Sequence, residues 1–105
     1  MEGGFVSRSD KPTGEVLERR AATERLAGLA GADWGIIAVQ VALPNIRRAQ
    51  TSNERNRLIN QLARSMVTEA RQQYRDDLVL FDVWLGAAIG AASACLEVGV
   101  DEDAA

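Results

Sequence analysis

The chain has 105 residues, of which 47% are hydrophobic and 26% are charged. This balance is typical of a globular protein, and the length suits one domain with one core. Twelve basic residues face fifteen acidic ones, and the net charge of -3 excludes a general attraction to nucleic acid or to an anionic membrane.

Residue types that are scarce or absent further limit the classes of function that we expect. Histidine is absent, which removes the commonest general base and the commonest zinc ligand. Cys95 is the single cysteine, so no disulfide can form within the chain. We therefore expect no catalytic site, no metal and no cofactor. With no leader segment recognised, we expect a cytoplasmic protein. Lys11 is the only lysine, and this arginine bias is typical of a GC-rich bacterial or phage genome.

The chain divides into three parts by composition. Residues 1–12 mix glycine, polar residues and a proline without apolar periodicity, which predicts a flexible N-terminal arm. Residues 13–98 carry the apolar patterns of a single helical domain. Residues 99–105 are mostly acidic or small and are expected to fray as a C-terminal tail.

A first helix is predicted over residues 13–29, with Thr13 as its cap. Gly28 and Gly31 mark its expected end, because glycine commonly follows the last helical residue. Two acid–arginine pairs at i,i+4 spacing support its surface: Glu15 with Arg19, and Glu24 with Arg20.

The segment over residues 33–43 is the most ambiguous in the chain. Asp33 can cap it and Pro44 is expected to end or kink it. Its β-branched residues favour a strand, but a lone strand needs a partner, and only residues 78–85 could supply one. We predict a helix here, with the strand pair as the alternative.

The firmest local prediction is a helix over residues 52–74. Thr51 and Glu54 match the capping-box pattern at its start. Its apolar residues recur at helical spacing on one face, and we expect Leu62 and Met66 to be buried there.

The last predicted helix covers residues 78–98, and the paired aspartates Asp76 and Asp77 can close the preceding helix and cap this one. It is apolar on all sides, so it must be buried on more than one face. Asp82 lies within the apolar run and would need a partner if buried. Together these patterns predict an all-α, compact bundle of three to four helices, with α+β as the alternative fold.

A row of arginines is the most chemically informative feature. Arg57, Arg64 and Arg71 recur every seven residues and Arg75 follows, so all four are predicted to lie on the helix face opposite the core. Such a row can hold carboxylates or phosphates. It can equally be a solvated face, or pair with the acidic residues of the first helix.

Small residues dominate the last helix and predict a close helix neighbour. Gly86, Gly90 and Ala94 follow one another at i,i+4 spacing, which lets another backbone approach. The neighbour is either a helix of the same chain or the same segment of a second copy, and we favour a homodimer.

These observations predict a small non-catalytic protein-interaction module, such as an assembly subunit, an adaptor or an inhibitor of a larger complex. The expected partner is a protein with an acidic surface that meets Arg57, Arg64, Arg71 and Arg75. The alternative is a nucleic-acid-associated protein that uses the same arginines, but no aromatic residue lies between Arg57 and Arg71 to stack on bases, and Tyr74 belongs to the apolar face. A membrane span is disfavoured by four polar residues in the two apolar segments: Asp33, Gln40, Asp82 and Glu97.

Overall fold

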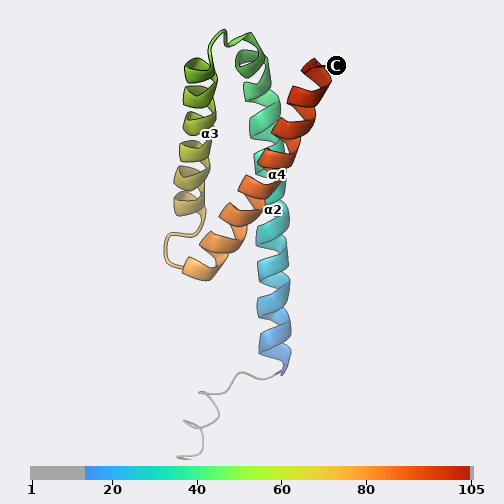
Figure 1. Ribbon diagram of the computed structural model, residues 1–105. Coiled ribbons are helices and arrows are strands. Elements are labelled where there is room, and N and C mark those ends of the chain that lie inside the picture. Colours follow the sequence, from blue (N-terminus) through green and yellow to red (C-terminus); the bar gives the residue numbers. More distant parts are fainter. Residues whose placement is uncertain (1–13, 105) are drawn as a thin grey trace, which may run out of the picture.

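The computed structural model describes residues 14–104, with side chains described from residue 14 to residue 99. It contains three helices, namely α2 (Gly14–Arg48), α3 (Ser52–Gln73) and α4 (Leu78–Ala104), and no strand lies in this part of the chain (Figure 1). The predicted all-α bundle is confirmed, with three helices. The alternative α+β fold is wrong, because residues 36–43 lie inside α2 and residues 78–85 inside α4. The N-terminal arm and the Thr13 cap lie outside the described residues.

Helix α2 corrects the prediction of two separate helices, because it runs unbroken through Gly28, Gly31 and Asp33. The inner face of α2 lies directly on α4. A Cβ atom at Gly31 would lie 2.2 Å from the Trp84 carbonyl oxygen, and one at Gly35 would lie 2.3 Å from the Ala88 carbonyl oxygen. These glycines therefore serve close helix packing and not helix termination.

Pro44 lies within the last turns of α2, although it was expected to end or kink this segment. Proline lacks the N–H that would donate to the carbonyl four residues earlier, so α2 lacks that one backbone bond. The helix nevertheless continues to Arg48, and Ile46 and Ala49 beyond the proline are buried. Apolar packing of this last turn keeps it attached to the bundle.

The core lies where the three helices meet. Trp84 of α4 is its largest fully buried side chain, and Trp34 of α2 packs beside it with ring centroids 5.5 Å apart. Val39 of α2 and Ala88 of α4 belong to the same cluster. Helix α3 contributes Leu62, Met66 and Ala70, so the predicted burial of Leu62 and Met66 is confirmed.

Both ends of α3 and the start of α4 match the sequence patterns closely. The Thr51 hydroxyl accepts a hydrogen bond from the Glu54 backbone N–H at 3.1 Å, which caps α3 as predicted. Tyr74 closes α3, donating its backbone N–H to the Ala70 carbonyl. Asp77 caps α4 by accepting from the Leu80 N–H at 3.1 Å. At its other end α4 continues to Ala104.

One ion pair connects the N-terminal part of α2 to the turn before α4. The N-terminal part of α2 projects beyond that turn (Figure 1). From there, Arg20 donates two hydrogen bonds to the Asp77 carboxylate, at 2.9 and 3.0 Å. The Arg20 guanidinium and the Leu80 N–H together lower the pKa of Asp77 to about 2, and Asp77 in turn raises the pKa of Arg20.

Candidate functional site

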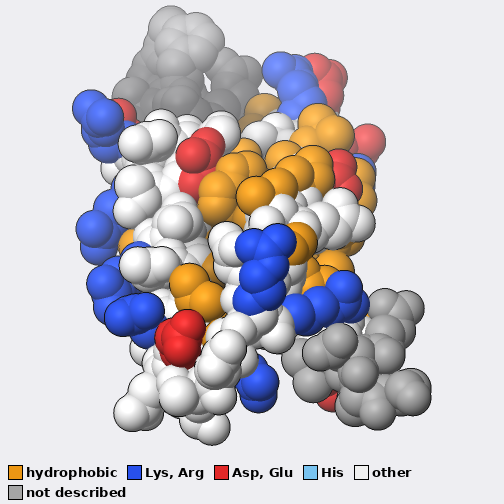
Figure 2. Space-filling model, turned by 90° about the horizontal axis from the view of Figure 1, so that it is seen from above, with side chains coloured by type: hydrophobic (Ala, Val, Ile, Leu, Met, Phe, Trp, Pro, Cys, Tyr) orange, Lys and Arg blue, Asp and Glu red, His pale blue; other side chains and the backbone are white. Residues whose placement is uncertain are grey.

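Helix α3 carries the predicted arginines on its solvent side. Arg57, Arg64 and Arg71 are exposed, whereas Leu62 and Met66 on the other side of α3 are buried. Basic side chains gather along the outer edge of the molecule formed by α3 (Figure 2). The spacing of seven residues places the three arginines nearly in line. This side of α3 is free of the core and open to a partner.

Arg75 differs from the prediction in its place. Helix α3 ends at Gln73, so Arg75 lies in the turn that follows and not on the helix. It is nevertheless exposed, and it lines the same cavity as Arg71. We call Arg57, Arg64, Arg71 and Arg75 the arginine row.

Two acidic side chains of α2 pair within α2 and not with the arginine row. Glu15 pairs with Arg19 and Glu24 with Arg20, as their i,i+4 spacing predicts. Among the described residues, no ion pair involves a member of the arginine row. The four guanidinium groups are therefore available for external carboxylates or phosphates.

The C-terminal end of the arginine row borders a cavity of about 600 Å³ between the end of α3 and the start of α4. Arg71 and Arg75 lie at this cavity together with Tyr74, Leu78 and Phe81. Leu78 is 76% exposed. This combination of side chains suits a ligand that carries an anionic group next to an apolar group.

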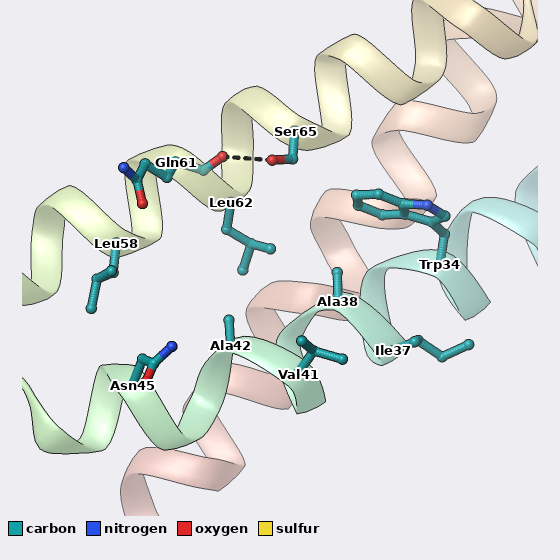
Figure 3. A pocket seen from close by; sticks show the side chains of 10 residues that line it. All are labelled: Trp34, Ile37, Ala38, Val41, Ala42, Asn45, Leu58, Gln61, Leu62 and Ser65. Atoms are coloured by element: carbon teal, nitrogen blue, oxygen red, sulfur yellow. Dashed lines mark hydrogen bonds between the residues drawn. The ribbon is translucent and has the colours of Figure 1, made fainter.

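A second hollow, which sequence reasoning missed, lies between α2 and α3 (Figure 3). We call it the α2–α3 groove. Its volume is about 530 Å³. Ile37 and Val41 on its α2 side are 59% and 74% exposed. The full lining is Trp34, Ile37, Ala38, Val41, Ala42 and Asn45 from α2 with Leu58, Gln61, Leu62 and Ser65 from α3.

The small-residue segment of α4 has two distinct sides. Ala88 and Ala92 are buried in the core, so part of this segment does have a close neighbour within the chain. Gly86, Gly90 and Ala94, which we call the small-residue face, are exposed. A Cβ atom at Gly86 or Gly90 would meet nothing within 4 Å. The residues predicted to self-associate therefore form a face that the described part of the chain leaves uncovered.

Other candidate side chains do not assemble into a site. Asp82 is exposed, so it needs no buried partner. Cys95 is a free, half-buried thiol. Among residues 14–99, no three His, Cys, Asp or Glu side chains are grouped closely enough to hold a metal ion.

Two helices in the described part of the chain are long and apolar enough to cross a membrane, namely α2 and residues 78–99 of α4. Only 22% of the most apolar window of each is buried within the chain. Apolar side chains of α2 and α4 accordingly reach the surface (Figure 2). Both helices thus have apolar surface that another molecule could cover.

Comparison of the chain with protein-family models, with curated proteins and with solved structures finds no match. The features of the chain that can carry a function are therefore the arginine row, the two hollows beside it and the small-residue face.

Proposed function

We propose that the chain is a non-catalytic protein-interaction module that binds an acidic protein surface through the arginine row. The observation that carries this proposal is four exposed arginines without an ion-pair partner among the described residues. Guanidinium groups make bidentate contacts to carboxylates, which lysines in the same places would not reproduce. An assembly subunit, an adaptor or an inhibitor would use such a surface.

Nucleic acid is the alternative ligand of the arginine row, because phosphates suit guanidinium groups equally well. Two observations favour protein. The net charge of -3 opposes general attraction to a polyanion. No aromatic residue lies between Arg57 and Arg71 to stack on bases, and Tyr74 and Phe81 adjoin the arginine row only at Arg71 and Arg75.

The arrangement of the helices favours a water-soluble, cytoplasmic protein over one that spans a membrane. Helices α2 and α4 run in roughly the same direction (Figure 1), so spanning by both would require α3 to return through the bilayer. Helix α3 carries exposed Arg57, Arg64 and Arg71, and a charge at that depth is costly. Exposed Asp33 on α2 and exposed Asp82 on α4 add to this cost.

Charge reversal in the arginine row tests the proposal. We expect the double variant Arg64→Glu/Arg71→Glu to lose the co-purifying protein that the wild-type chain retains in its host cells, because carboxylates would then face carboxylates. The circular dichroism spectrum should stay unchanged, since both side chains are exposed. The control Arg19→Glu/Arg25→Glu makes the same change of charge on exposed residues of α2 and should retain the partner. It also removes the Glu15–Arg19 ion pair, which is exposed and contributes little to stability.

Two outcomes would overturn this proposal. Retention of the same partner by the Arg64→Glu/Arg71→Glu variant would make the arginine row a solvated face. Tight binding of a short labelled DNA duplex, with an affinity that falls steeply with salt, would assign the row to phosphates, because phosphate contacts release counterions.

A further inference from the structure

We infer that the α2–α3 groove receives an amphipathic helix of the partner protein, with its apolar face in the groove and an acidic flank along Arg57 and Arg64. This inference rests on the proposed function, and it names the form in which the acidic partner is recognised. Helix-in-groove binding is a general mode in which apolar side chains at i, i+3, i+4 and i+7 enter a groove.

The first support is the apolar character of the groove in the free chain. Ile37 and Val41 expose 59% and 74% of their surface to water, although they lie beside the core residue Leu62. Trp34 lies at one end of the groove (Figure 3). Its ring packs on Trp84, with ring centroids 5.5 Å apart. An apolar partner that covers this surface beside the aromatic ring removes apolar area from water, and this favours binding.

The second support is the shape of the groove. Its α2 side extends from Trp34 to Asn45, about 17 Å at the helical rise per residue, which corresponds to three turns. On the opposite side, Leu58 and Ser65 of α3 lie two turns apart. A hollow between two neighbouring helices is the place where a third helix packs its ridge of side chains.

The third support is charge. None of the residues that line the groove is acidic. Gln61 lies on its rim, and Arg57 and Arg64 are its surface neighbours on α3, at i-4 and i+3. On the α2 side, Arg48 donates a hydrogen bond to the Asn45 side chain at 3.3 Å. Acidic residues also lie next to the groove, because Asp33 precedes Ile37 and Glu54 precedes Leu58 by one turn. The acidic flank of the partner helix is therefore placed along Arg57 and Arg64, where two cations lie two turns apart on α3.

Helices α3 and α4 of a second copy of this chain are poorer occupants. The exposed face of α4 carries Asp82 and Glu97, which are about four turns apart and cannot both meet Arg57 and Arg64, two turns apart on α3. Helix α3 itself exposes Arg57, Arg64 and Arg71, which would be repelled by the arginine row of another copy.

A synthetic peptide serves as the probe. It forms a helix with leucines at i, i+3, i+4 and i+7 and glutamates along one flank, and a second peptide carries lysines in place of the glutamates. We expect the glutamate peptide to bind the wild-type chain and the lysine peptide to bind at least about tenfold more weakly. Binding should also change the tryptophan emission, because Trp34 lines the groove whereas Trp84 is fully buried.

Variants then locate the site. Ile37→Glu/Val41→Glu should weaken glutamate-peptide binding by at least about tenfold. The matched control Val79→Glu/Ile89→Glu places the same charges on exposed apolar residues of α4 and should bind as the wild type does. Arg57→Glu/Arg64→Glu should reverse the preference, so that the lysine peptide binds more tightly than the glutamate peptide. Circular dichroism confirms that each variant is folded.

The outcomes separate this inference from the proposed function. Wild-type affinity in the Ile37→Glu/Val41→Glu variant overturns the inference. The proposed function survives that result if Arg64→Glu/Arg71→Glu still loses the native partner, and it falls as well if the partner is retained. A wild-type dimer that Ile37→Glu/Val41→Glu converts to monomer would make the occupant a second copy, which also overturns the inference.

Discussion

At the scale of single residues, the Asp77 carboxylate serves two structural functions. It caps α4 through the Leu80 N–H, and it holds the projecting part of α2 through Arg20. The paired aspartates indicated the cap from sequence alone, because Asp is a preferred N-cap residue. The bond to Arg20 was not predictable in this way. Arg20 has a local partner in Glu24, and only the folding of α3 brings Asp77 to it.

Replacing Asp77 by Asn should separate these two functions. Asn caps a helix about as well as Asp but cannot form the ion pair. The folded-state pKa of Asp77 is lowered to about 2 from its ordinary value of 3.8, so the ion pair stabilises the fold fully above pH 3.8. That contribution is lost as the pH falls through about 2. Urea unfolding should therefore show Asp77→Asn to be less stable than the wild type at pH 7, with the difference closing near pH 2.

The neighbouring carboxylate provides the control for this prediction. Asp76 is exposed, and Asp76→Asn should unfold at the same urea concentration as the wild type at both pH values. A difference for Asp77→Asn that stayed constant down to pH 2 would assign its effect to the cap and not to the ion pair.

At the scale of elements, α2 shows where sequence patterns fail. Gly28 and Gly31 resemble a helix end, because a glycine taken by itself can either stop a helix or admit a neighbour. The distinguishing signal was the spacing of Gly31 and Gly35, one turn apart on the stripe that also holds buried Ala27 and Val39. By contrast, α3 and the start of α4 were predictable because their caps are local to Thr51, Glu54 and Asp77.

Replacing a glycine of α2 by alanine is predicted to change the stability of the fold in opposite directions at two positions. Gly35→Ala should destabilise the fold by about 1 to 3 kcal/mol, because the added Cβ would lie 2.3 Å from the Ala88 carbonyl oxygen and would push α2 away from α4. Gly28→Ala should instead stabilise it by about 0.5 to 1 kcal/mol, since its Cβ would make an ordinary contact with Val83 at 3.6 Å. Thermal and urea unfolding of both variants measure these changes. Stabilisation by Gly35→Ala would contradict the close packing of the two helices.

At the scale of the whole molecule, apolar surface exceeds what a three-helix core can cover. Six large apolar side chains are buried besides alanines, whereas eleven are exposed among the described residues. The arginine row was predictable because a seven-residue period keeps charges on one helix face. The α2–α3 groove was not, because it exists only once α3 folds back along α2 and leaves Ile37 and Val41 unburied.

The small-residue face of α4 is a surface on which a second copy can pack. It is exposed, and none of its residues lines the α2–α3 groove. A dimer formed there would leave both grooves and both arginine rows free. The assembly would then present two equivalent binding sites, which raises the affinity for a partner that carries two acidic helices.

Gly90→Leu tests this dimer. Gly86 and Gly90 let the backbone of the same segment in a second copy approach closely across a two-fold axis, and a leucine would hold the two helices apart. Because Gly90 is exposed and a Cβ atom there would meet nothing within 4 Å among the described residues, the variant should remain folded. We expect light scattering to show a dimer for the wild type and a monomer for Gly90→Leu, with equal helix content by circular dichroism. Ala63→Leu adds a leucine to an exposed position of α3 and should stay dimeric. A wild-type chain that remains monomeric at high micromolar concentration would refute the dimer, and the exposed glycines would then be available to a different protein.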